Sequence, residues 1–173
     1  LYLAGQWLLN GENGPQDPAA GLALIEKAAA KNLPAALYHV ARARIDGRGL
    51  PPDPAKGYQQ MHAAADRGLS GAQYYLAGRY ERGQGLTPNP DRARHYYRRC
   101  ATQGIAQCQF RLGRLLLDLP TRPASESLQA IAFLELAGPA LPEAAALAQS
   151  EGASLTPDQR AWVDALKREL LRK

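Results

Sequence analysis

The sequence has few of the residues from which catalytic and metal sites are usually built. Its 173 residues include only two cysteines, three histidines and one methionine. His39, His62 and His95 do not lie at metal-ligand spacing from a Cys, Asp or Glu on one helix face. No serine lies in a nucleophile-elbow pattern, and no acid pair is marked out by its surroundings. The sequence therefore predicts no metal, no cofactor and no enzymatic activity.

Long apolar runs are also absent. No run approaches the roughly 20 residues that a helix needs to span a membrane, and no signal-peptide pattern is visible. Because the sequence begins at Leu1, inside an expected helix, we expect its N-terminus to be cut from a longer repeat array. The missing signal therefore excludes no compartment.

Charge is not concentrated in one segment. The formal net charge is +5, but Arg and Lys are spread along the chain and mixed with Asp and Glu. This pattern is typical of solvated helix faces, although a basic balance also suits an acidic partner. Aromatic residues are sparse, whereas Ala and Leu are abundant. Both residues favour helices because they lose little side-chain entropy there.

A 36-residue repeat organises the sequence. The stretch RIDGRGLPPDPAKG at 44–57 and the stretch RYERGQGLTPNPDRA at 79–93 share the core Gly-x-Gly-Leu-x-Pro-(Asp/Asn)-Pro. A dinucleotide-binding loop needs a strand before its glycines and a helix directly after them. Here a helical pattern precedes the glycines and prolines follow them. We therefore interpret the stretch as the turn of a repeated helical hairpin.

The second copy shows how each hairpin is expected to form. Its first helix, helix A, covers about 35–46 and ends at Gly47 in a left-handed conformation. Asp53 caps the second helix, helix B, which has Pro54 at its first position and ends at Gly68. In the other copies, the same columns predict N-caps at Asp17, Asn89 and Ser125 and left-handed residues at Asn32 and Gly104.

Several of these residues are similar to a known repeat. The segment AQYYLAGRYERGQGL at 72–86, followed by Pro88, Ala93, Ala101 and Gly104, closely resembles a Sel1-like repeat. This bacterial family is a 36-residue relative of the tetratricopeptide repeat. The resemblance implies an all-α fold, namely a right-handed superhelical solenoid of antiparallel helix hairpins with a C-terminal capping helix.

The repeat divides the chain into about four copies and a C-terminal end. We expect copies at 1–34 (partial), 35–70, 71–106 and 107–142, the last divergent because Leu-Pro-Thr replaces Gly-x-Gly there. Residues 143–173 are expected to form the capping helices, the first of them short, at 143–149. The final helix opens with Thr156 and Gln159 in a capping box, with Pro157 between them. Its charged outer face suits a terminal cap, so we expect the C-terminus to be native.

Cys100 and Cys108 replace alanines at an expected close contact between a helix B and the next helix A. Their columns contain Ala64 and Ala72. Two cysteines at such a contact can meet disulfide geometry, and the alternative is a pair of buried thiols. The Cys-x7-Cys spacing also resembles the secreted, cysteine-rich branch of the family, where it is a disulfide. A disulfide implies an oxidising compartment, such as a bacterial periplasm or cell envelope, with the cytoplasm as the alternative.

The segment RHYYRRC at 94–100 mixes arginines and aromatic residues as nucleic-acid binders do. Tyr97, however, shares a column with Met61 and Phe133, which predicts that it lies in the core. The arginines then decorate the outer face of a helix B. We therefore expect no nucleic-acid partner.

The inner face of the A helices is the better candidate for a binding site. It is expected to lie apart from Tyr74, Ala77 and Tyr80, which are assigned to the core. Arg, Tyr and His on a rigid concave wall suit an acidic or extended peptide or a carboxylated polymer, and the alternative is a solvated face. The candidate residues are His39, Arg42, Tyr75, Arg79, Arg82, Arg111 and Arg114.

The resemblance implies a non-enzymatic scaffold that binds a protein partner through its concave face. A second hypothesis is a periplasmic scaffold in an exopolysaccharide secretion complex, with the basic groove facing an acidic polymer. A third is an enzyme of the cysteine-rich branch, for which β-lactam binding has been proposed, but no residue here supplies its chemistry. The sequence does not identify the partner or the oligomeric state.

Overall fold

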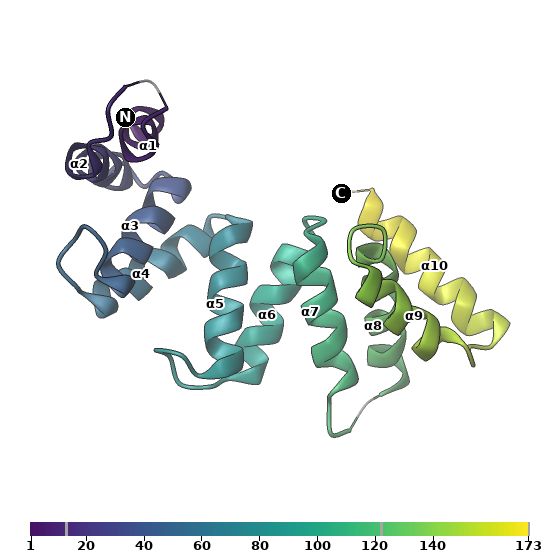
Figure 1. The fold of residues 1–173 in the computed structure, drawn as a ribbon. Coiled ribbons are helices and arrows are strands. Elements are labelled where there is room, and N and C mark those ends of the chain that lie inside the picture. Colours follow the sequence, from purple (N-terminus) through teal and green to yellow (C-terminus); the bar gives the residue numbers. More distant parts are fainter. Residues whose placement is uncertain (13, 122, 173) are drawn as a thin grey trace. The chain divides into compact units, whose positions relative to one another are not determined.

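The computed structural model describes residues 1–12, 14–121 and 123–172, and the regular secondary structure of this part of the chain is α-helix alone, joined by turns and loops (Figure 1). The helices are α1 Tyr2–Asn10, α2 Pro18–Ala29, α3 Pro34–Asp46, α4 Pro54–Asp66, α5 Ser70–Arg82, α6 Pro90–Ala101, α7 Ala106–Leu117, α8 Ala124–Ala137, α9 Pro142–Gly152 and α10 Pro157–Leu171. The expected all-α class is confirmed. Among the described residues, no helix is long and apolar enough to cross a membrane.

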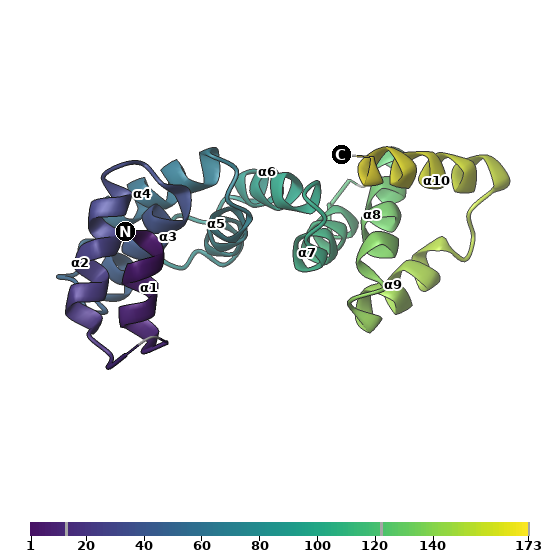
Figure 2. The ribbon, with the colours of Figure 1, turned by 90° about the horizontal axis from the view of Figure 1, so that it is seen from above.

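The chain forms two compact units, Leu1–Thr87 and Pro88–Lys173, and the described residues of each unit form five helices. In the first unit, each helix from α1 to α4 packs against the next one along the chain. In the second unit, α6, α7 and α8 pack in the same order, and both α9 and α10 pack against α8 (Figure 2). Antiparallel hairpins therefore recur within each unit.

Local capping explains where the helices begin and end. The side chains of Asp17, Asp53 and Asn89 accept hydrogen bonds from backbone N–H groups three residues further on. Gly47 and Gly83 end α3 and α5 with φ of 65° and 67°. Left-handed residues also stand at the three predicted ends of the B helices, namely Asn32, Gly68 and Gly104. These parts of the sequence prediction are confirmed.

The prediction of an N-cap at Ser125 is wrong. The helix α8 begins at Ala124, its N-cap is Pro123, and no side chain caps it. In the earlier copies a proline follows the cap, at the first helical position. Here the proline comes earlier, and its extended conformation lets the helix start directly after it. Ser125 therefore lies inside the first turn.

The second glycine of each Gly-x-Gly stretch serves packing. A Cβ atom at Gly49 would lie 2.3 Å from Leu22, and one at Gly85 would lie 2.3 Å from the Tyr58 hydroxyl. Leu22 and Tyr58 are 36 residues apart, so the same contact recurs. The Tyr58 hydroxyl also donates to the carbonyl of Gln84 at 3.1 Å. The glycines therefore allow the turn to approach helix B closely, in agreement with its predicted role as the turn of a helical hairpin.

The core contains Met61, Tyr97 and Phe133 as predicted. Tyr74 was assigned to the core as well, but it is 38% exposed. Gln73 takes the buried position instead, because its amide donates to the carbonyl of Ala65 at 3.0 Å. A buried amide is tolerated where it is hydrogen-bonded.

The C-terminal helices largely follow the sequence. Thr156 and Gln159 form the predicted capping box at the start of α10. The helix α9 extends to Gly152 and is longer than the expected 143–149. Its burial of Ala144, Ala148 and Gly152 on one face explains the extra turn.

Candidate functional site

In the first unit, the structure brings together four of the predicted site residues, His39, Arg42, Tyr75 and Arg79. They lie on α3 and α5, the A helices of successive hairpins. Two residues that sequence reasoning missed join them. We call the six residues together the arginine–tyrosine face: Tyr2, Tyr38, His39, Arg42, Tyr75 and Arg79.

Two guanidinium groups lie close to the ring of Tyr75. The Cζ atom of Arg79 is 4.8 Å from the ring centroid, and that of Arg42, which comes from the neighbouring helix α3, is 5.9 Å away. Arg79 also donates to the Tyr75 hydroxyl at 2.7 Å. Each cation–π contact contributes about 0.5–1 kcal/mol at an exposed site. These contacts fix both guanidinium groups while leaving N–H donors available.

Arg42 is the exposed member of the arginine–tyrosine face, whereas the other five residues are half-buried. Its side chain is 45% exposed and forms an ion pair with Asp46 at 3.6 Å. A hydrogen bond with Tyr38 raises the pKa of Arg42, and nearby Asp46 and Tyr75 raise it further. An exposed surface pair of this kind contributes little to stability. The ion pair therefore holds Arg42 only weakly.

His39 connects α1 to α3. Its ring lies 5.7 Å from that of Tyr2 and 5.5 Å from that of Tyr38, measured between centroids. Burial, followed by the positive charge of Arg42, lowers the pKa of His39. The imidazole is therefore neutral at pH 7. A hollow of about 180 Å³ lies beside it, lined by His39, Arg42, Ala43, Asp46 and Arg48.

Arg82 compensates for a glycine in the same unit. Gly78 shares a column with Arg42 and Arg114, so α5 lacks an arginine at that position. A Cβ atom at Gly78 would lie 2.9 Å from Nη2 of Arg82, so this guanidinium covers the glycine. Arg82 also donates to the side chain of Gln84 at 3.2 Å. The Arg82 guanidinium therefore lies next to Gly78, at the repeat position where α3 and α7 carry an arginine.

The two remaining candidates, Arg111 and Arg114, lie on α7 in the second unit. The Cζ atom of Arg114 is 5.9 Å from the ring centroid of Phe110. Arg42 makes the equivalent contact with Tyr38 at 6.0 Å, one helical turn away on α3. The aromatic–arginine pair at i, i+4 is thus repeated in both units.

The missed residues carry a sequence signal. Tyr2, Tyr38, Tyr74 and Phe110 follow one another at 36-residue intervals. A column of aromatic residues at the repeat period indicates a shared role, and half-buried rings next to arginines suit a binding surface. Assigning Tyr74 to the core concealed this column.

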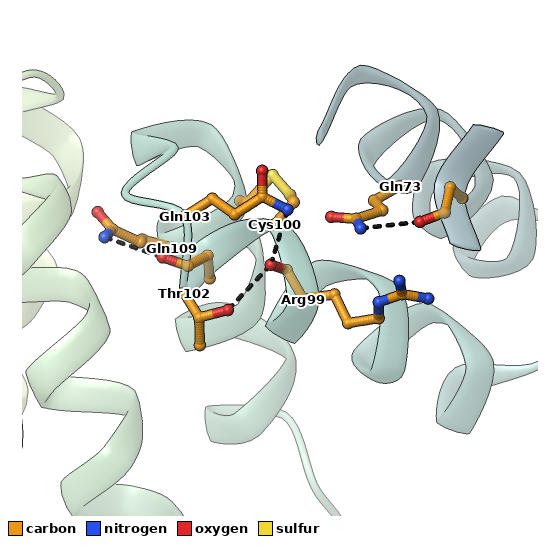
Figure 3. The surroundings of a disulfide bond; sticks show 9 residues. Gln73, Arg99, Cys100, Thr102, Gln103 and Gln109 are labelled. Atoms are coloured by element: carbon orange, nitrogen blue, oxygen red, sulfur yellow. Dashed lines mark hydrogen bonds between the residues drawn. A yellow bond between two sulfur atoms is a disulfide. The ribbon is translucent and has the colours of Figure 1, made fainter. Parts of the chain in front are cut away.

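The structure joins Cys100 of α6 to Cys108 of α7 in a disulfide, with their Cα atoms 5.8 Å apart (Figure 3). Both residues are fully buried. Beside the disulfide, the amide of Gln109 donates to the carbonyl of Ala101 at 3.2 Å, and Thr102 and Gln103 both donate to the carbonyl of Arg99. The cross-link therefore fastens the end of a helix B to the start of the next helix A.

Metal ligands do not gather in the part of the chain that the structure describes. No group of three or more His, Cys, Asp or Glu side chains there could hold a metal ion. The arginine–tyrosine face presents cations and phenol hydroxyls, which act as hydrogen-bond donors.

Helical hairpins that recur every 36 residues define the class of this protein as a helical-hairpin repeat protein. The Sel1 repeat model matches residues 1–33, 34–69, 70–105 and 106–138, and the chain therefore belongs to the Sel1 repeat family. Sel1 repeats generally mediate protein–protein interaction, and the family is one of non-catalytic scaffolds.

Two solved structures share the fold. A Sel1 repeat protein from Oxalobacter formigenes is similar over 97% of this chain and 71% of its own, with 23% identity and a TM-score of 0.76. The protein c5321, a protective antigen of uropathogenic Escherichia coli with an SLR fold, has 19% identity and a TM-score of 0.61. The match covers 99% of this chain but only 45% of c5321. No curated protein sequence matches the chain.

Proposed function

We propose that this chain is a non-enzymatic scaffold that binds an acidic, extended segment of a partner protein on the arginine–tyrosine face. The observation that carries the proposal is the placement of the Arg42 and Arg79 guanidinium groups near the ring of Tyr75. Guanidinium groups bind carboxylates through paired, charge-assisted hydrogen bonds. Groups that are already held in place lose less conformational entropy when the partner binds.

The charge around this face supports an acidic partner. Arg42, Arg48, Arg79 and Arg82 contribute four positive charges, whereas Asp46 is the carboxylate paired with Arg42. Half-buried aromatic rings next to these cations suit apolar side chains that alternate with the acidic ones. An extended peptide presents successive side chains in this manner.

A selection from random peptides tests the class of partner. Phage-displayed dodecapeptides would be selected for binding to the full chain. Phage that also bind the variant Arg42→Gln/Arg79→Gln would be removed. We expect enrichment of sequences rich in Asp and Glu. Enrichment of peptides without acidic residues would contradict the proposal.

A binding experiment with a polysaccharide distinguishes the proposal from the hypothesis of an acidic polymer as the partner. Polygalacturonate would be titrated into the same protein, with the neutral polymer dextran as the control. Binding of polygalacturonate together with a failure to enrich any peptide would replace the protein partner by an anionic polymer.

We also propose that the protein works in an oxidising compartment, the periplasm or cell envelope. The disulfide between Cys100 and Cys108 supports this location, because structural disulfides rarely persist in a reducing cytosol. Fractionation of cells that produce the full-length protein would test it. Recovery with cytosolic markers would contradict it.

A further inference from the structure

A separate cleft lies in the second unit, where α9 and α10 both pack on α8. The helix α8 places Leu134 and Ala137 against α9, and Ile131 and Ala132 against α10. The two helices therefore lie on different sides of α8, as Figure 2 shows. The gap between them is a cavity of about 700 Å³, which is within the range of ligand sites. We call it the C-terminal cleft.

Small residues form the α9 side of the C-terminal cleft. Ala145, Ala148, Gly152 and Ala153 line it there, with Gly138 at the end of α8. A Cβ atom at Gly138 would lie 3.2 Å from that of Ala145, so the glycine allows the close approach of α9. Apart from Gln149, this side offers an apolar surface of small side chains.

The α10 side of the cleft is cationic. Arg160 and Lys167 both donate to the carboxylate of Glu135 on α8, Lys167 at 2.6 Å. Burial would raise the pKa of Glu135, but its hydrogen bonds with Lys167 and Arg160 lower the pKa below its ordinary value. Glu135 therefore stays ionised and holds the two cations in place.

Glu135 does not use all the donors of these cations. Arg160 donates to Glu135 and to the carbonyl of Gly152 at 3.4 Å, although a guanidinium carries five N–H donors. Lys167 pairs with Glu135 and, at 3.6 Å, with Asp164 at the rim. Arg160 and Lys167 thus share the carboxylate of Glu135, Lys167 also pairs with Asp164, and the Arg160 guanidinium keeps N–H donors that these contacts do not use.

We propose that the C-terminal cleft is a second binding site, which takes a carboxylate-bearing segment of a peptide. The carboxylate binds Arg160 and Lys167, and the small side chains next to it lie on the α9 surface. The unused N–H donors of Arg160 and the apolar side of the cleft favour this occupant over a cation or a purely apolar ligand. The site shares no residue with the arginine–tyrosine face.

Two variants test the charge of the site in opposite directions. Glu135→Gln and Arg160→Gln both break the same ion pair, so a purely structural role would make them alike. If the cleft binds a carboxylate, Glu135→Gln strengthens binding several-fold, because it removes the competing carboxylate. Arg160→Gln weakens it about tenfold, because it removes a charge-assisted hydrogen bond. Arg168→Gln, on the exposed side of α10, is the matched control and leaves binding unchanged.

The probe is an acetylated and amidated octapeptide of alternating Ala and Glu, with an Ala–Gln octapeptide as its neutral counterpart. The full chain would carry Arg42→Gln/Arg79→Gln, so that binding at the arginine–tyrosine face does not contribute. Backbone amide shifts of Gly138 and Gly152 in ¹⁵N spectra report the C-terminal cleft. Those of Gly5 and Gly21, in the first unit, serve as the reference.

A steric pair of variants keeps the test independent of the ion pair. Gln149 lines the cleft and Ala146, also exposed on α9, does not. Gln149→Trp should abolish the shifts of Gly138 and Gly152, whereas Ala146→Trp should preserve them. Three results would each overturn the proposal. The Ala–Gln peptide could bind as well as the Ala–Glu peptide, or Glu135→Gln and Arg160→Gln could change binding equally. The third result is that neither Gly138 nor Gly152 shifts when the peptide is added.

Discussion

Arg42 of α3 contacts Tyr75 of α5, with its Cζ atom 5.9 Å from the centroid of the ring. The two residues belong to successive hairpins, so the contact exists only because the hairpins stack. Tyr75 in turn accepts a hydrogen bond from Arg79. The repeat thus brings residues 33 positions apart together on one surface.

The disulfide should stabilise the protein by cross-linking adjacent repeats. For a sequence separation of 8, the chain-entropy model gives about 2–3 kcal/mol. Cys100→Ala/Cys108→Ala should therefore lower the free energy of unfolding in urea by about this amount. Packing should be preserved, because Ala64 and Ala72 are fully buried in the same columns.

A thiol titration of the purified protein provides the control for that comparison. Under denaturing, non-reducing conditions we expect no titratable thiol. Two thiols per chain, or equal urea midpoints with and without reductant, would contradict a stabilising disulfide.

His39 should make stability depend on pH. Burial and Arg42 lower its pKa, and it faces Tyr2 from α1 and Tyr38 and Arg42 from its own helix. The unfolded chain therefore binds this proton more readily than the folded one. The contribution of neutral His39 is complete above the unfolded pKa of about 6.5 and is lost as the pH falls through the lower pKa of the folded state.

Urea midpoints at pH 7.5 and pH 5.5 measure this effect. We expect a smaller decrease on acidification for His39→Gln than for the natural chain. An acidic partner favours protonated His39, so its affinity should rise over the same interval, again less in the variant. Identical pH profiles for the two proteins would exclude His39 as the titrating group.

We expect the buried side chains of Gln73 and Gln109 to stabilise the fold more through packing than through their hydrogen bonds. The carbonyl of Ala65 accepts from the amide of Gln73 and also from the backbone N–H of Gly68 at 3.0 Å. Leu37 occupies the same column and is buried. Gln73→Leu should therefore cost less than about 1 kcal/mol, and Gln73→Ala about 2 kcal/mol. Equal losses in thermal or urea unfolding would show that the hydrogen bond dominates.

Much of the fold could be predicted because the signals are local. Gly47 ends α3 and Asp53 caps α4 through interactions with residues at most a few positions away. The same reasoning was wrong at Ser125, where Pro123 displaces the start of the helix. A residue that can cap a helix, standing at the right position of the repeat, does not by itself fix where the helix begins.

The candidate site was predicted only in part, because side-chain direction depends on neighbouring helices. Periodicity does not decide which of Gln73 and Tyr74 faces the core, and the hydrogen bond of the buried Gln73 amide is invisible in the sequence. The C-terminal cleft was not predicted at all. It depends on how α10 packs on α8 after the 36-residue repeat has ended.

The central claim is that Arg42 and Arg79 bind an acidic segment of a protein. Fluorescence anisotropy with a labelled acidic peptide from the selection would measure it, with Lys31→Gln as an exposed control outside the site. We expect Arg42→Gln/Arg79→Gln to weaken binding at least about tenfold, since each charge-assisted hydrogen bond contributes about that factor. Lys31→Gln should have no effect. Equal affinity of the natural chain and the double variant would contradict the account.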